Sequence, residues 1–259
     1  MLLLAIPLGL AIGIIVGAVG GGGAILALPV LVYVLGEGVG PASTASLIVV
    51  ALAAAVGAGA LALRGHVCWR LALRFSAPAA LGSLLGALAN GAVSGRLLIL
   101  AFIPVMLLAA GATWRRAGSD GEDGDDGPCS ASSFGRIALA GVGIGALTGF
   151  FGVGGGFMIV PVLTVWFGMG FRRAVATSLV IITLTGLAAL ASHLVAGAAP
   201  HVGVTVALAG GTAVGALIGT VVAQRLPRAA LGRAFAVVVA LVALFLLADV
   251  LVLGGPPTA

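Results

Sequence analysis

The sequence predicts an all-α polytopic membrane protein made of two inverted-topology repeats. The 259-residue chain is 61% hydrophobic and only 7% charged, whereas a soluble domain carries about 25% charged residues. Long apolar stretches recur along the chain, and a glycine-rich motif near its beginning occurs again in the second half. With so little polar surface available, most of the exterior must face lipid rather than water.

Each half of the chain is expected to hold two short apolar stretches followed by three longer ones. A spanning helix needs about 20 apolar residues, and the short stretches fall below that length. We expect each short pair to be a re-entrant or half-helix pair, and a pair that crosses twice is the alternative. The stretches are 2–19, 24–35, 43–63, 71–92 and 97–114, then 137–151, 157–168, 174–196, 202–223 and 229–253.

The second half repeats motifs of the first half in the same order. GAVGGGGAILALPVL at 17–31 aligns with GFFGVGGGFMIVPVL at 149–163, with an offset of 132 residues and seven of fifteen positions identical. Two further blocks follow: STASL at 43–47 with VATSL at 175–179, and GSLLGAL at 82–88 with GTAVGAL at 211–217. Because all three blocks occur in the same order in both halves, they indicate a duplicated unit.

An acidic segment separates the two copies. It lacks the closing Glu of an EF-hand calcium loop, and its composition favours a solvated cytoplasmic linker. The chain is therefore expected to divide into a first transmembrane repeat at 1–114, a linker at 115–136 and a second transmembrane repeat at 137–259. The acids of the linker are Asp120, Glu122, Asp123, Asp125 and Asp126.

The arginines predict how the copies sit in the membrane. All 12 basic residues are arginine, and nearly all lie in alternate connections. Loops on the cytoplasmic side collect such residues, so we interpret them as topology determinants and expect no nucleic-acid partner. With the arginine-rich connections inside, 43–63 runs inward and 174–196 runs outward. The copies are therefore predicted to be inverted, with both termini outside.

The interrupting glycines are the first candidate binding residues. Broken helices in corresponding positions of inverted halves point to a transporter site near the midplane. The N–H groups at a helix start lack partners and carry partial positive charge, and glycine lets a ligand approach them. The breaks therefore predict an anion site, with close helix packing as the alternative. The candidates are Gly20, Gly22, Gly23, Gly152, Gly154 and Gly155.

Packing is the favoured interpretation for a second set of glycines, which are spaced by four residues. These are Gly82, Gly86, Gly211, Gly215 and Gly219. Prolines 29 and 161, which follow the breaks, are expected to bend or end the short helices.

Hydroxyl side chains at the start of the first long span in each half are the second set of candidates. They are expected either to donate hydrogen bonds to an oxyanion or to cap those helices, and the two roles are compatible. The residues are Thr44, Ser46, Thr177 and Ser178.

The sequence indicates no enzyme, metal site or cofactor. Cys68 and Cys129 are expected to be two free thiols on one face, without a nearby partner in sequence for redox or nucleophilic chemistry. Acids outside the linker lie only at segment ends, as Glu37 and Asp249. A proton pump based on a midplane carboxylate is therefore disfavoured.

The paired glycine–proline blocks at 20–31 and 152–163, with the blocks at 44–47 and 176–179, resemble the TauE/SafE sulfite exporter family. The likeness covers nearly the whole chain. It implies a multi-pass protein of the bacterial plasma membrane that moves sulfite, sulfoacetate or a related organosulfonate or thiosulfate out of the cell. The first copy departs from the second at Ala45, which aligns with Thr177.

Together, these features predict an exporter of a small sulfur-containing anion that works by alternating access and is surrounded by membrane lipid. An anion channel with the same residues along a continuous pore is the alternative. A membrane enzyme or redox protein that uses Cys68 or Cys129 is a second, less favoured alternative.

Overall fold

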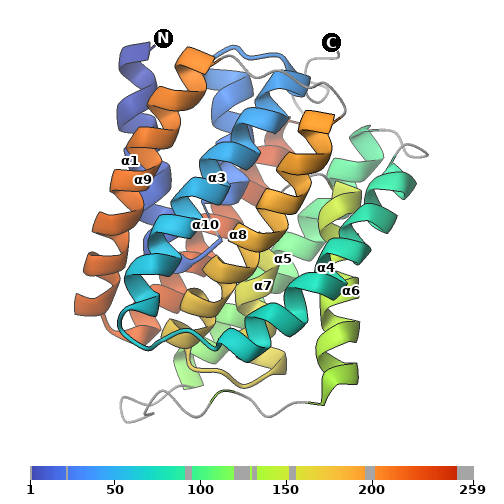
Figure 1. The fold of residues 1–259 in the computed structure, drawn as a ribbon, viewed down its shortest axis with the longest axis vertical. Helices are drawn as coiled ribbons and strands as arrows, with labels where there is room; N and C mark the ends of the chain where they lie inside the picture. Colours follow the sequence, from blue (N-terminus) through green and yellow to red (C-terminus); the bar gives the residue numbers. More distant parts are fainter. Residues whose placement is uncertain are drawn as a thin grey trace.

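The computed structural model describes residues 2–21, 23–90, 95–119, 129, 133–151, 156–195 and 202–249. Every regular element in these ranges is helical (Figure 1). The elements are α1 (Leu2–Val19), α2 (Ala24–Pro29), η1 (Val30–Val34), α3 (Val39–Ala62), α4 (Trp69–Asn90), α5 (Gly95–Ser119), α6 (Phe134–Phe151), α7 (Gly156–Pro161), η2 (Val162–Trp166), α8 (Phe171–Val195), α9 (Val202–Arg225) and α10 (Arg228–Ala248).

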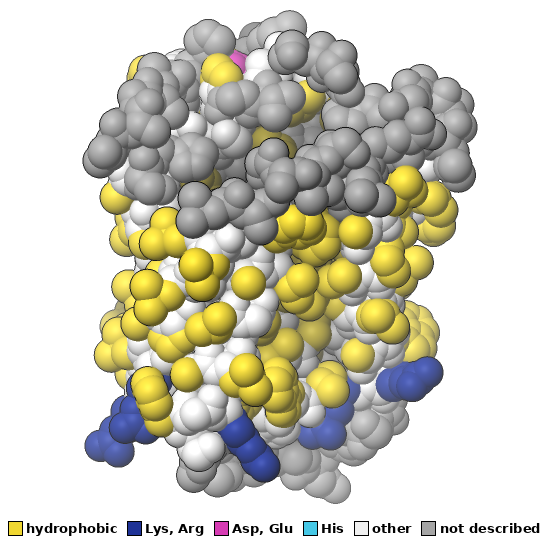
Figure 2. Space-filling model, turned by 90° about the vertical axis from the view of Figure 1, so that its right-hand side faces the viewer, with side chains coloured by type: hydrophobic (Ala, Val, Ile, Leu, Met, Phe, Trp, Pro, Cys, Tyr) yellow, Lys and Arg dark blue, Asp and Glu magenta, His cyan; other side chains and the backbone are white. Residues whose placement is uncertain are grey.

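Five of the described helices contain a segment long and apolar enough to cross a membrane. The predicted all-α polytopic membrane fold is therefore confirmed. Figure 2 shows a wide hydrophobic band over one face of the molecule, with arginine side chains gathered below it. The five segments are Pro41–Ala62, Phe134–Phe151, Phe171–Ala191, Val202–Arg225 and Arg228–Ala248.

The two halves of the chain run in opposite directions. Helices α1 and α3 both begin at the end of the molecule that holds the two termini, whereas α6 and α8 begin at the opposite end (Figure 1). Because α1 and α3 begin at the same end, α1 and the short helix after it enter the bundle and return. Figure 2 shows arginine side chains gathered at one end, and Figure 1 places the termini at the other. This is the arrangement that the predicted topology requires.

Both short helices contain a proline followed by a π-helical turn. Pro29 and Pro161 have the same backbone angles, φ −55° and ψ −41°. Since proline has no N–H to donate, the α-helical ladder cannot continue unchanged, and a wider turn follows at Val30–Val34 and Val162–Trp166. Each turn then ends at a left-handed glycine, Gly36 or Gly168, a common way to terminate a helix.

Closely packed glycines join each half to the other. Helix α1 packs along α9, and α6 packs along α4. A Cβ added to Gly13 on α1 would overlap the backbone of Thr212, and one added to Gly145 on α6 would overlap that of Ala79. The packing role predicted for Gly82, Gly86, Gly211, Gly215 and Gly219 is confirmed, because each faces the partner helix's backbone in the same way.

Helices continue into both ends of the segment 115–136, which is predicted to be a linker. Helix α5 extends through Ser119 and α6 begins at Phe134, so Arg115, Arg116 and Arg136 are helical. The acids from Asp120 to Asp126 lie outside the described residues. At the arginine-rich end, the guanidinium of Arg233 lies over the Trp114 ring, 5.9 Å from its centre, and connects α10 with α5.

Candidate functional site

The first glycine break reverses the chain in the interior of the bundle. Gly20 has φ +71° and Gly21 has φ +44°, a left-handed conformation that side chains with a Cβ rarely adopt. Gly23 precedes α2 and packs against Val16 and the carbonyl of Ile12. These contacts hold the start of α2 against the end of α1.

The first break contacts the second half of the protein directly. The backbone of Gly21 lies against that of Gly156, at the start of α7, with no room for a Cβ between them. A Cβ on Gly20 would lie 2.8 Å from Ser178 Oγ and 3.1 Å from Val160 Cγ2. The fold therefore brings Gly20 and Ser178 into contact, with no room for a ligand between them.

Four of the predicted glycines, Gly22, Gly152, Gly154 and Gly155, lie outside the described residues. Their role in an anion site remains a prediction. Gly21, in the first break, and Gly156, which follows the second break, contact each other in the interior.

The candidate hydroxyl groups are bonded within the protein. Ser46 Oγ donates to the carbonyl of Ser43 at 2.9 Å, and Ser178 Oγ donates to that of Val175 at 2.8 Å. These bonds are equivalent in the two halves. A serine that bonds back to its own helix offers no hydrogen to a ligand in the same rotamer. In this conformation, neither serine donates to an anion.

The proposed capping role is wrong for all four hydroxyl residues, because they lie inside their helices. Helix α3 begins at Val39, before Thr44 and Ser46, and α8 begins at Phe171, before Thr177 and Ser178. Thr44 and Thr177 are completely buried. Thr177 Oγ1 accepts a hydrogen bond from the backbone N–H of Cys68 at 3.2 Å. This contact connects α8 with the turn between α3 and α4.

A small cavity lies beside the first break, toward the arginine-rich end. Its volume is about 20 Å³, enough for one water molecule and too small for a sulfur oxyanion. Helices α1, α3, α8, α9 and α10 contribute to its largely apolar wall. Among its lining residues are Gly17, Ala18, His66, Arg172, Thr220 and Gln224.

Two residues of this wall, Arg172 and Gln224, hold buried hydrogen-bond donors. Arg172 Nη2 donates to the carbonyls of Gln224 and Leu226, at 3.0 and 3.1 Å. Its Nε and the amide nitrogen of Gln224 are buried and have no partner in the part of the chain that the structure describes. Buried donors without partners are costly, and an anion is a suitable acceptor for both.

Sequence reasoning assigned no binding role to Arg172 or Gln224. Arg172 was interpreted there as a topology determinant. A polar amide at the end of the apolar α9 was the available signal. Only the fold shows that both residues lie in the wall of one cavity, where the Arg172 side chain bonds to the backbone at the end of α9.

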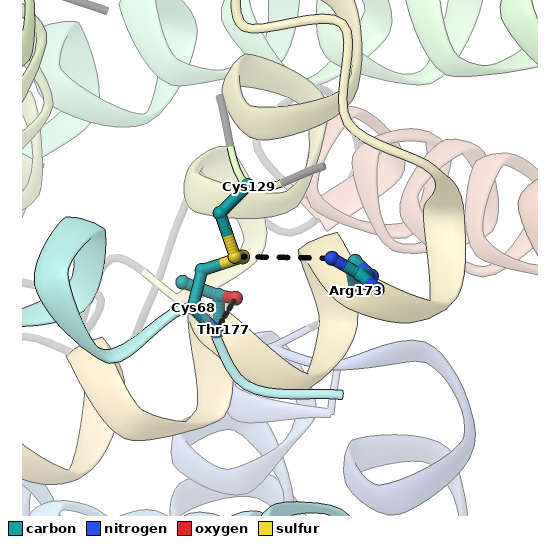
Figure 3. Close-up of a disulfide and its surroundings, with 4 residues drawn as sticks. All are labelled: Cys68, Cys129, Arg173 and Thr177. Carbon is teal, nitrogen blue, oxygen red and sulfur yellow. Dashed lines mark hydrogen bonds between the residues drawn. A yellow bond between two sulfur atoms is a disulfide. The ribbon is translucent and has the colours of Figure 1, made fainter. Parts of the chain in front are cut away.

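The expectation of two free thiols is wrong, because Cys68 and Cys129 form a disulfide (Figure 3). Cys68 lies just before α4 and is 3% exposed, whereas Cys129 is exposed. The two are 61 residues apart in sequence. Since neither lies in a recognisable spacing motif, the bond depends on how the α3–α4 turn meets the segment between the halves.

Comparison with known proteins agrees with these features. A family profile described as "Sulfite exporter TauE/SafE" matches residues 5–246. A protein of Xylella fastidiosa strain Temecula1 is 32% identical over 248 residues, which cover 91% of each chain. One of strain 9a5c is 32% identical over 178 residues, which cover 68% of this chain and 67% of the relative.

Both relatives are named "Probable membrane transporter protein". No solved structure gives a significant match to the chain. The multi-pass helical fold, the repeated glycine breaks and the match over nearly the full length lead to the same assignment. The chain belongs to the TauE/SafE sulfite exporter family of membrane transporters.

Proposed function

We propose that this protein exports a small sulfur-containing anion by alternating access between two inverted repeats. The substrate class is sulfite, sulfoacetate or a related organosulfonate or thiosulfate. The family match supports the class. The observation that carries the mechanism is the closed contact between Gly21 and Gly156, beside a small cavity whose wall includes Gly17, Ala18 and Arg172.

The cavity would be the entry point for an anion that comes from the arginine-rich end. Arg172 carries a positive charge, and buried N–H groups of Arg172 and Gln224 lack partners among the described residues. Charge-assisted hydrogen bonds to an oxyanion are stronger than bonds between neutral groups. An anion that approaches from the arginine-rich end would therefore meet these donors first.

The glycine breaks would form the central binding site for the anion. Once the Gly21–Gly156 contact opens and the Gly20 N–H releases the carbonyl of Val16, to which it donates at 2.9 Å, amides at Gly20, Gly22 and Gly23 would bind the anion. Their counterparts Gly152, Gly154 and Gly155 would contribute in the same way. Hydroxyls of Thr44, Ser46, Thr177 and Ser178 would assist. Ser178 must first release the carbonyl of Val175, so binding and a local rearrangement would be coupled.

The closed contact favours a carrier over a channel. A channel needs a continuous pore in its conducting state, but the backbones of Gly21 and Gly156 touch and the neighbouring cavity has room only for water. Opening and closing this contact in alternation would expose the site to one side at a time. An inside-negative potential would assist export by about 2.3 kcal/mol per charge per 100 mV.

Sulfite efflux from proteoliposomes tests the proposal. The wild-type protein is expected to release labelled sulfite, and external sulfite is expected to accelerate that release by exchange, as in a carrier. Arg172→Met is expected to raise the KM for sulfite about tenfold, because a charged hydrogen bond is worth about 1.5 kcal/mol. Arg70→Met removes an exposed arginine from the same end and should leave the KM unchanged.

The results have clear alternatives. Absence of sulfite movement by correctly inserted protein would overturn the substrate class. Flux without exchange acceleration would favour the channel. Equal effects of Arg172→Met and Arg70→Met would remove the cavity from the substrate path.

A further inference from the structure

The disulfide lies beside the candidate transport site. The backbone N–H of Cys68 donates to Thr177 Oγ1 at 3.2 Å. The next residue, Ser178, faces Gly20 of the first break. Cys68 is therefore one hydrogen bond away from the helix segment that contacts the glycines.

A cation faces the exposed end of the same disulfide. Arg173 Nη1 lies 3.8 Å from Cys129 Sγ, and Figure 3 shows the side chain pointing toward the sulfur. Arg173 follows Arg172, which lines the cavity. Its Nε is buried and has no partner among the described residues. An anion at Cys129 would thus lie next to a guanidinium.

The location makes a purely structural disulfide unexpected. The arginine-rich end is predicted to face the cytoplasm, where disulfides are rare and usually transient or redox-sensing. Exchange at a disulfide depends on which sulfur is accessible to a nucleophile. Here Cys129 is exposed, whereas Cys68 is 3% exposed.

We propose that the Cys68–Cys129 disulfide is a sulfitolysis site, opened by attack of sulfite on Cys129. The proposal rests on the proposed function in one respect, because that function supplies sulfite as the anion gathered at this end. Sulfite is itself a sulfur nucleophile that reacts with disulfides. The product is an S-sulfonate on Cys129, whose negative charge faces Arg173.

The step balances without an oxidant. The sulfur lone pair of sulfite forms a bond to Cys129 Sγ, and the bond between the two cysteine sulfurs breaks. The electron pair leaves with Cys68 Sγ as a thiolate, which takes a proton from water. In reverse, the Cys68 thiolate attacks the S-sulfonate, expels sulfite and restores the disulfide.

Opening the bond would release the covalent link beside Thr177. Cys68 precedes α4, and its backbone is bonded to α8 through Thr177. The disulfide would therefore respond to the concentration of the transported anion at the arginine-rich end and change the attachment of the α3–α4 turn.

Intact protein in proteoliposomes, purified without reductant, tests the proposal. Treatment with sulfite is expected to add one SO₃ group to the Cys129 peptide and to release one free thiol at Cys68, both measured by mass spectrometry after thiol labelling. Sulfate at equal ionic strength should do neither. Arg173→Gln should slow the reaction about fivefold, and Arg173→Lys should restore most of the rate. Arg70→Gln is the matched control.

Several outcomes would overturn the proposal: two free thiols before treatment, no adduct, an adduct on Cys68 instead, or equal rates in Arg173→Gln and Arg70→Gln. Efflux of labelled sulfite is measured on the same vesicles and on the Cys68→Ser, Cys129→Ser double variant. Efflux without an adduct would overturn this inference alone. An adduct without efflux would overturn the proposed function and leave the sulfitolysis site in place.

Discussion

At the scale of single residues, Ser178 shows how one side chain combines a structural bond with a proposed binding role. Its hydroxyl donates to the carbonyl of Val175, and its Oγ faces the backbone of Gly20. A hydroxyl bonded to its own helix contributes little net stability. The same hydroxyl could turn toward an anion once the glycine contact opens.

Ser178→Ala is therefore expected to raise the KM for sulfite about tenfold while the melting temperature of the detergent-solubilised protein changes little. Ser76→Ala is the matched control, because Ser76 Oγ makes the same kind of bond to its own helix, to Ala72 O at 2.7 Å. Vesicle efflux and thermal unfolding measure the two effects. If both variants transport alike, Ser178 does not bind the anion.

The sequence could predict residues of the candidate anion site only where they lie in motifs that both halves share. Gly20 and Ser178 lie in repeated motifs, and the structure places them in contact. Arg172 and Gln224 carry no motif, and their proximity depends on a hydrogen bond from the Arg172 side chain to the backbone at the end of α9. The Cys68–Cys129 pairing likewise depends on a contact between two connections, which no periodicity encodes.

At the scale of helices, the stripes of glycine allow backbones to approach closely. Gly9, Gly13 and Gly17 on α1 correspond to Gly141, Gly145 and Gly149 on α6, at the same offset of 132 residues. Each one faces backbone of the partner helix with no room for a Cβ. Because lipid gives little hydrophobic drive for helix association, such close contact is a principal stabilising interaction.

Gly145→Leu is expected to lower the melting temperature strongly or to prevent folding, because its Cβ would overlap the carbonyl of Ala79. Gly143→Leu lies on the same helix with nothing within 4 Å of its Cβ, so it should leave stability nearly unchanged. Fluorescence-detected size exclusion after heating compares the two. Equal stability would contradict the packing role of the stripe.

Helix boundaries were predictable where composition changes sharply. The stretch predicted at 2–19 is α1, and the one at 24–35 is the continuous helix from Ala24 to Val34, because glycines delimit both. The end of α5 was predicted too early. Arg115 and Arg116 end the apolar run, but arginine is a good helix former, and the helix continues to Ser119.

At the scale of the whole molecule, the arginines and the termini occupy opposite ends (Figure 2). In a Cys68→Ser, Cys129→Ser background, Gly38→Cys and Arg64→Cys place single thiols at exposed positions at these two ends. A membrane-impermeant maleimide is expected to label Gly38→Cys on intact cells and Arg64→Cys only after permeabilisation. The reverse pattern would invert the topology and the direction of transport.

The pairing of α1 with α9 and of α6 with α4 also determines which parts of the polypeptide can act as mechanical units. The first helix of each half packs against a helix of the other half. Neither half could fold to completion alone, since its opening helix would lack the groove into which it fits. In the proposed alternating-access cycle, the moving bodies would therefore be hybrids of both halves, and the duplicated segment would not be the unit that moves.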